Sequence, residues 1–439
     1  MLSSMRDLCD RVAALRAEGL GRTAIVEKAG NEGWATKQDV FGAYWLLQSD
    51  FDLEETEALE RDVETTALKA DVQKYKRENK ALKLKANKVD RLVEAYSRSR
   101  PPREPIPPKE IKSEGHKQVL ITCSGDEHIS AMLEYERLHG LNQYNLGIAR
   151  RRMLYTAELA GAYVMHYWKE KNITRIVDIN FGDKFQGTIH DAEATNECEQ
   201  SDAVIHWLNT KTDCYDMILR QCPHVRITSV HLTGNHSRRS KDRDVDRPKN
   251  HDDYLSAKFL ERDFRNEPRV EFVVPNSYWQ TLNINGHAFI CTHGQFIKSW
   301  AGIPFYGIMR YYKAMTGIME RTDEYQSMLI NSVKALIQKH GDDLTLDDYA
   351  PIKRHWIQGH FHTCCAGIDT EYGEIFMNGS LIGPEDFGLS LGAASSAKQL
   401  FIAVHPDRVT DRAPIDLSHI RDPRLQKPLE VLEPITVMA

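Results

Sequence analysis

Seven side chains that can bind metal ions occur in five short blocks of the chain. The seven are Asp126, His128, Asp183, Asn235, His293, His360 and His362. No single helix or loop could span residues 126 to 362, so a folded domain must bring the blocks together. Carboxylates, imidazoles and one amide form a mixed oxygen and nitrogen ligand set, which suits Mn, Fe or Zn and is not that of a thiolate zinc knuckle. An Asp within such a set can bridge two ions, and ions about 3.5–4 Å apart are used to hydrolyse phosphate esters.

Each block follows a segment that reads as a buried strand. The expected strands are Gln118–Cys123, Arg175–Asn180, Arg226–Leu232, His287–Cys291 and Trp356–Gln358, followed by Glu374–Met377 and Gln399–Val404. Helical segments alternate with these strands, mainly at Leu146–Lys171 and in an insert at 298–340. Strands alternating with helices predict an α/β domain over residues 116–405, and a Pro- and charge-rich tail is expected at 406–439.

The five blocks, in this order, resemble the calcineurin-like metallophosphoesterase superfamily, whose pattern is DxH, GDxxD, GNH, H and GHxH. The resemblance covers roughly residues 118–405 of the chain, about two thirds of it. It implies a two-sheet sandwich flanked by helices, with metal ions at the strand ends. One block alone would be a weak signal, whereas five in order at strand ends are specific.

The resemblance also implies a role for each residue. Asp126, His128, Asp183 and His362 would hold one divalent ion, and Asp183, Asn235, His293 and His360 would hold the other. His236 matches the family histidine that protonates the leaving oxygen or steadies the phosphorane. The chemistry agrees, because two ions activate water and an imidazole can donate a proton near neutral pH. Manganese is the expected metal, with Mg, Fe or Zn as alternatives.

Two departures from the family pattern bear on substrate. Gln186 stands where the family has a second carboxylate after the GD pair, a position that usually supports a ligand rather than binding metal. Thr233 precedes the GNH glycine and Ser237 follows its histidine, which argues against the protein-phosphatase branch.

The first hundred residues precede this domain. Residues 1–50 are expected to form three short helices, with Thr36 and Asp39 in a capping box. A helix-turn-helix is one interpretation, but six Lys and Arg against seven Asp and Glu favour a docking or structural role over DNA binding. Residues 51–99 are expected to form a coiled-coil helix, and 100–115 a Pro-rich extended linker.

The coiled coil rests on an uninterrupted heptad from Leu68 to Tyr96. Flanking pairs such as Asp71 with Lys76 and Glu78 with Lys83 are attractive in a parallel pairing, so a parallel homodimer through 68–96 is favoured over a single packed helix. From Lys69 to Arg103 this segment holds twelve Lys and Arg against four Asp and Glu, which could follow a phosphate backbone.

Basic residues near the site suggest a polymeric substrate. Residues 237–249 carry six Lys and Arg, and Arg238 and Arg239 could reach phosphates that flank the scissile one. The Arg150–Arg152 run and Arg310–Lys313 add basic and basic-aromatic patches. We therefore predict a phosphodiester hydrolase acting on nucleic acid, with DNA preferred, loosely resembling the DNA-end-processing repair nucleases. A phosphatase or cyclic-nucleotide phosphodiesterase, and a scaffold protein with a vestigial esterase fold, remain alternatives.

Composition is that of an ordinary globular chain. The 439 residues carry a net charge of -6 and eight scattered cysteines, which predict idle thiols in a reducing compartment. No apolar run of ~18 residues predicts a membrane span, and the charged start lacks the features of a secretion signal. A cytoplasmic location without a membrane partner is expected, and a compact nuclease with its own dimerisation segment would suit a phage.

Overall fold

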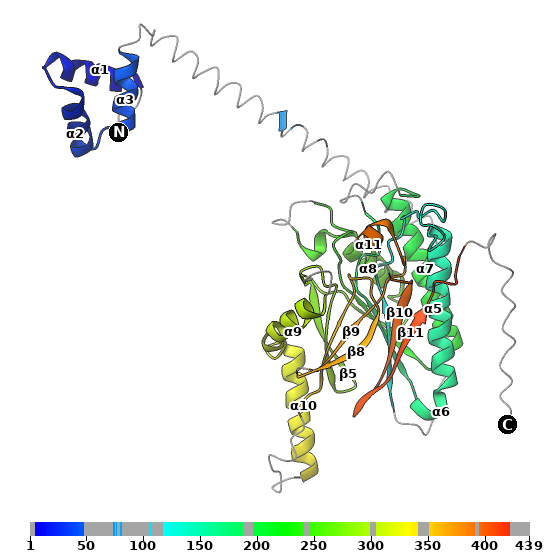
Figure 1. Cartoon of the computed structure of the whole chain (residues 1–439). Coiled ribbons are helices and arrows are strands. Elements are labelled where there is room, and N and C mark those ends of the chain that lie inside the picture. The colour runs from blue at the N-terminus through cyan, green and yellow to red at the C-terminus, as the bar shows by residue number, and fades with distance from the viewer. Residues whose placement is uncertain are drawn as a thin grey trace. The chain divides into compact units, whose positions relative to one another are not determined.

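The computed structural model describes residues 5–47, 73–74, 76, 80, 106, 117–187, 196–240, 246–298, 304–340, 351–371, 373–390 and 395–421. The chain divides into two compact units, Met1–Val89 and Asp90–Ala439 (Figure 1). The predicted coiled coil at 68–96 and the linker at 100–115 fall almost wholly outside the described residues. The homodimer therefore stays a prediction.

Residues 5–47 of the first unit form three helices, α1 (Met5–Ala17), α2 (Arg22–Glu32) and α3 (Lys37–Leu46). Their shared core is formed by Leu8, Cys9, Val12, Leu15, Ile25, Ala29, Trp34, Val40 and Ala43. The predicted capping box is confirmed, because the Thr36 amide donates to Asp39 at 2.7 Å and the Asp39 amide to the Thr36 hydroxyl at 3.2 Å. DNA binding by this unit stays a prediction.

The described residues of the second unit form two β-sheets. The larger sheet has the order β11-β10-β1-β2-β3-β4. Its strands are β1 (Val119–Ser124), β2 (Arg175–Asn180), β3 (Arg226–His231), β4 (Val270–Val273), β10 (Lys398–His405) and β11 (Arg408–Asp416). Strands β1 to β4 are parallel, whereas β10 and β11 run antiparallel to their neighbours. The carboxyl ends of β1, β2 and β3 therefore meet at one edge.

The smaller sheet has the order β5-β6-β7-β9-β8. Its strands are β5 (Trp279–Ile284), β6 (His287–Thr292), β7 (Arg354–Gln358), β8 (Cys365–Thr370) and β9 (Gly373–Met377). The central pair β6 and β7 is parallel. Both strands are nearly continuous runs of buried residues, as expected for strands covered on both faces.

The two sheets pack face to face, with helices outside each. The core between the sheets joins Ile121, Cys123 and Val177 of the larger sheet to Phe289 and Phe376 of the smaller one. The helices on the side of the larger sheet are α5 (Leu146–His166), α6 (Trp168–Lys171), α7 (Gln200–Gln221) and α8 (Asp252–Asp263) (Figure 1). Those on the side of the smaller sheet are α9 (Phe305–Met319) and α10 (Asp323–His340). Two short helices, η2 (Pro248–Asn250) and α11 (Asp386–Ser390), lie in loops. This is the two-sheet sandwich flanked by helices that the resemblance implies.

One strand corrects the sequence prediction. The last strand was expected at Gln399–Val404, yet β11 follows it and pairs with β10 from residues assigned to the tail. Charged residues and Pro414 fill this segment, and its burial alternates along the strand. Such a sequence is compatible with the outermost strand of a sheet, where one side of the backbone is unpaired and proline is tolerated.

Among the helices within the described ranges, none combines the length and the apolar character that a membrane crossing requires.

Candidate metal centre

Each predicted ligand lies just after the carboxyl end of a parallel strand. Asp126 follows β1, Asp183 follows β2, and Asn235 follows β3. His293 comes directly after β6, and His360 and His362 follow β7. Because these ends meet at one edge of the stacked sheets, residues far apart in the sequence converge.

The backbone at these positions is unusual. Five predicted ligands have a left-handed conformation, with φ of 48° at Asp126, 46° at His128, 50° at Asp183, 71° at His360 and 55° at His362. Non-glycine residues rarely adopt it, and it costs roughly 1–3 kcal/mol at each position. The backbone after these strands therefore adopts an unfavourable conformation at the positions of the predicted ligands.

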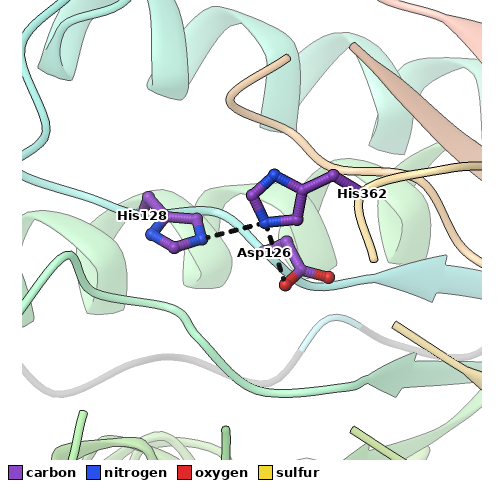
Figure 2. Close-up of side chains that lie close together, drawn as sticks. All are labelled: Asp126, His128 and His362. Carbon is purple, nitrogen blue, oxygen red and sulfur yellow. Dashed lines mark hydrogen bonds and ion pairs between the residues drawn. The ribbon is translucent and has the colours of Figure 1, made fainter. Parts of the chain in front are cut away.

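Asp126, His128 and His362 form the first cluster (Figure 2). The Nε2 atoms of His128 and His362 face each other at 3.3 Å, and Nε2 of His362 lies 3.4 Å from Oδ1 of Asp126. That Oδ1 atom is buried and accepts no hydrogen bond. Two ring nitrogens and a carboxylate oxygen that point at one another are suited to a shared cation.

Asp183, Asn235, His293 and His360 form the second cluster. Nε2 of His293 lies 3.0 Å from Oδ2 of Asp183, 3.2 Å from Oδ1 of Asn235 and 3.2 Å from Nδ1 of His360. A carboxylate oxygen of Asp183 also lies within 4.8 Å of a ring nitrogen of His128, which is within ligand distance, meaning close enough for the two atoms to bind one ion. The Asp183 carboxylate therefore lies between the two clusters. The structure therefore brings together all seven residues predicted from the sequence, with Asp183 in the shared position.

The other ring nitrogen of three histidines is oriented by the protein. Nδ1 of His128 donates to Oε1 of Gln186 at 2.7 Å, and Nδ1 of His293 donates to the carbonyl of Phe181 at 3.0 Å. Nδ1 of His362 lies 3.6 Å from a carboxylate oxygen of Glu385. Such partners fix the ring and direct Nε2 toward the site, as they do for histidines that bind metal.

The surroundings shift the pKa values of the clustered histidines in opposite directions. Burial and the neighbouring His236 and His362 rings lower the pKa of His128 to about 3, and burial with His293 lowers that of His360 to about 4. Burial opposes protonation of His293 too, but Asp183 and Asp126 raise its pKa to about 9. In the protein without an ion, a proton on His293 offsets the buried carboxylates.

These observations test whether divalent ions fit the residues. The unsatisfied Oδ1 of Asp126, the facing imidazole nitrogens and the mixed oxygen and nitrogen donors all suit Mn, Fe or Zn. The residues therefore fit the two-ion site that the resemblance implies.

His236, the predicted proton donor, lies beside the clusters. Its backbone amide donates to Oδ1 of Asp183 at 2.7 Å, and its Nδ1 lies 3.1 Å from the carbonyl oxygen of Gln186. Its ring packs edge-on against His128, with centroids 4.6 Å apart. His236 is also within ligand distance of His128 and Asp183.

The predicted substrate arginines engage neighbouring protein groups. Nε of Arg238 donates to the carbonyl of Asn235 at 3.0 Å, and its Nη1 lies 3.8 Å from Asp246. Arg239 forms an ion pair with Asp252 at 2.7 Å. Their role in binding substrate phosphates stays a prediction, and part of this basic loop lies outside the described residues.

The Arg150–Arg152 run is not a basic surface patch. Arg150 pairs with Asp213 at 2.8 Å, and Arg151 donates to the carbonyl of Arg421. Arg152 is fully buried and donates to the carbonyls of Leu381 and Ile382 at 2.6 and 2.9 Å. The amides of those two residues donate to the carbonyl of Asp126. Arg152 therefore stabilises the backbone that holds the first predicted ligand.

The Arg310–Lys313 segment is only partly available to a ligand. Tyr312 is buried against Trp356, and Tyr311 packs edge-on against the same indole. Arg310 and Lys313 are exposed. The two tyrosines therefore belong to the core beneath α9 and do not form a base-stacking surface.

Several supporting residues carry no motif of their own. Glu127, within the first block, points into the interior, where Asn180 donates to it at 3.2 Å and Trp207 donates to its other oxygen. Burial raises the pKa of Glu127 to about 7, against the opposing charge of Lys211. Glu385 lies beside His362, and Asp253 accepts the backbone amide of Asp183. Neither residue belongs to a motif by which the sequence would reveal it.

In its two stacked sheets and the predicted ligands at their strand ends, the chain matches the calcineurin-like metallophosphoesterase fold that the sequence resemblance implies. No protein-family model matches the chain, and no curated protein matches it. Among solved structures it is similar to Vps29 of Entamoeba histolytica with Zn²⁺, at 10% identity over 68% of this chain and 99% of that one, with a TM-score of 0.25. It is also similar to a dimetal phosphatase of Danio rerio, at 9% identity over 68% of this chain and 99% of that one, with a TM-score of 0.32. A 5'-nucleotidase of Candida albicans is similar at 10% identity over 71% of this chain and 54% of that one, with a TM-score of 0.32. Likenesses this remote assign no activity.

Proposed function

We propose that this protein is a divalent-metal-dependent phosphodiester hydrolase that acts on nucleic acid, with DNA the preferred substrate. The observation that carries the proposal is the convergence of the two ligand clusters on Asp183, whose carboxylate lies within ligand distance of both His128 and His293. Divalent ions bound there would supply Lewis acidity, which makes water acidic and neutralises charge on a phosphate.

The chain's own residues provide the remaining functions. Gln186, the Phe181 carbonyl and Glu385 orient three histidines. His236 is held by the carbonyl of Gln186 on one side and by Asp183 at its backbone, which places an imidazole beside the clusters as a candidate proton donor to the leaving oxygen.

Two observations support a diester over a monoester. Arg238 and Arg239 are already matched by Asp246 and Asp252, and a singly charged diester needs less added positive charge than a monoester dianion. Helices α9 and α10 present their buried side chains, including Tyr312 and Met315, to the outer face of the smaller sheet. A phosphatase or a cyclic-nucleotide phosphodiesterase would instead need this insert to cover the site and exclude polymers, whereas these helices pack on the sheet.

The test compares bis-p-nitrophenyl phosphate with p-nitrophenyl phosphate, each with Mn²⁺ and with EDTA. We expect Mn²⁺-dependent turnover of the diester and little of the monoester. Preferred turnover of the monoester would favour the phosphatase. No turnover of either, together with no bound metal, would favour the scaffold alternative.

The nucleic-acid part of the proposal needs its own experiment. End-labelled single- and double-stranded DNA and RNA oligonucleotides, incubated with Mn²⁺, Mg²⁺ or EDTA, should show metal-dependent cleavage of DNA. Diester hydrolysis without cleavage of any oligonucleotide would contradict a nuclease while leaving the hydrolase intact.

A further inference from the structure

One buried carboxylate outside the ligand set bonds to two ligand loops at once. Oδ2 of Asp253 accepts the backbone amides of Asp183 at 3.0 Å and of Gly234 at 2.9 Å. Its Oδ1 accepts the amide of Lys184 at 3.1 Å. Asp253 is fully buried, so these three bonds face little competition from water.

The two loops touch where Asp253 joins them. A side-chain carbon at Gly182 would lie 2.2 Å from the amide nitrogen of Gly234, and one at Gly234 would lie 2.1 Å from Oδ1 of Asp183. Neither loop therefore has room for a side chain that could make this connection. The amides there must be satisfied from elsewhere, and Asp253 satisfies three of them.

A second hydrogen bond holds the backbone of Asp253. Nζ of the buried Lys184 donates to the backbone carbonyl of Asp253 at 2.6 Å. Asp253 lies in the first turn of α8, so the start of this helix is bound to the loop after β2 by side chain and backbone. Helix α8 and the two loops thus form one connected unit.

The residues held in this way are those that face both clusters. Asp183 is the carboxylate between the clusters, and Asn235 directly follows Gly234. With its amide held by Asp253, Asp183 receives the His236 amide on Oδ1 and presents Oδ2 to His293. A shift of either loop would move ligand oxygens away from the opposing nitrogens.

We propose that Asp253 is a positioning residue for the metal centre, which fixes the loops of Asp183 and Asn235 relative to each other so that both ions bind. This inference rests on the proposed function, because it takes the two clusters as ion sites. It assigns to Asp253 no contact with substrate or metal. Its role is to set the positions of oxygen ligands that other residues supply.

The test is the Asp253→Asn variant, with Glu261→Gln as its control. Asn has the same shape but only one oxygen, so at least one loop amide loses its acceptor. Glu261→Gln makes the same change of charge on the exposed end of the same helix, where Glu261 pairs with Lys258. Mn²⁺ binding is measured by titration calorimetry and electron paramagnetic resonance, and folding by circular dichroism.

We expect Asp253→Asn to bind Mn²⁺ about 10–100-fold more weakly, the range typical for groups that orient metal ligands. The spin-coupled signal of two neighbouring ions should give way to that of isolated ions, which a general loss of stability would not produce. Glu261→Gln should match the wild type. Wild-type affinity and coupling in a folded Asp253→Asn variant would overturn the proposal.

A wild-type measurement covers the case in which the variant does not fold. In hydrogen exchange followed by mass spectrometry, added Mn²⁺ should protect peptides covering 181–187, 233–240 and 252–257 together. Protection of the two loops without the start of α8 would refute the role of Asp253. If the wild type binds no Mn²⁺ at all, the proposed function itself fails, which is a separate result.

Discussion

Gln186 orients His128: its Oε1 atom accepts the Nδ1–H of that ring at 2.7 Å. An amide oxygen cannot donate, so Nδ1 carries the proton and Nε2 of the neutral ring is left to face His362. Gln186 stands where the family pattern has a carboxylate, and its neutral amide oxygen still provides an acceptor for the His128 ring.

Removing this acceptor should weaken one ion site selectively. We expect Gln186→Ala to lower the affinity of the Asp126, His128 and His362 site for Mn²⁺ about 10–100-fold, because His128 loses its orienting partner. The site of His293 should change much less. Calorimetric titration separates the two binding events, and Gln186→Glu, which keeps an acceptor, should retain most of the affinity. Equal weakening of both sites would count against this role.

His236→Ala should separate catalysis from metal binding. Loss of a proton donor typically lowers turnover about 10²–10⁴-fold, whereas the seven predicted ligands remain in place. Metal content per chain by mass spectrometry and turnover of bis-p-nitrophenyl phosphate are the two measurements. Because His236 lies within ligand distance of His128 and Asp183, loss of an ion from the variant would reassign it as a ligand.

Deleting residues 1–100 should give a monomer that still hydrolyses small diesters. The described cores of the second unit draw on residues from 106 onward and on none from the first unit, so the sandwich should fold without it. Light scattering gives the mass, and the diester assay gives the activity. A truncated chain that remains dimeric would refute the heptad at 68–96 as the dimerisation element.

His287 should make the metal-free protein sensitive to acid. Its Nδ1 lies 2.9 Å from Nε2 of His355, and its Nε2 donates to the carbonyl of Pro406 at 2.9 Å. Burial, with the neighbouring His355, lowers the pKa of His287 to about 4. A histidine in the unfolded chain titrates near pH ~6.5, so the unfolded state takes up the proton first as pH falls. The stability linked to His287 is therefore complete above pH ~6.5 and lost as pH falls to ~4.

Urea unfolding in EDTA, between pH 7.5 and 4, measures this effect. The loss attributable to His287 should be at most about 3 kcal/mol, and a His287→Asn variant should show a correspondingly shallower decline. His128 and His360 also have lowered pKa values, but they are present in both proteins and cancel in the comparison. Identical pH dependence in the two proteins would contradict this assignment.

The strands that precede the predicted ligands could be predicted because each is a short run, buried except at one end in most cases, that leads into a ligand block. Strand β2 spans Arg175–Asn180 as expected, and β6 extends the expected segment by one residue. Strands β4, β5, β8 and β11 are the edge strands and have few or no buried positions, so they give no continuous apolar run. Sheet position, which the local sequence does not encode, decides their structure.

The ligand set could be predicted from residue types and order, whereas its supports could not. Asp253 lies 70 residues from Asp183 and reaches it only through the packing of α8, so its spacing carries no signal. The Arg150–Arg152 run shows the opposite failure. Three adjacent arginines suggested a surface for phosphates, yet the fold pairs or buries each of them, and Arg152 has a structural role.

The left-handed backbone at five ligand positions sets thermal stability against ion binding. Glycine adopts this conformation without strain, so glycine at residue 128 or 360 would relieve local strain in the ion-free chain while removing a ligand. His128 is also buried and bonded to Gln186, so its replacement by glycine would leave a cavity and an unpaired amide oxygen. The local backbone strain therefore lies at the same positions as the predicted ligands, so it cannot be relieved with glycine without removing the side chains that would bind the ions.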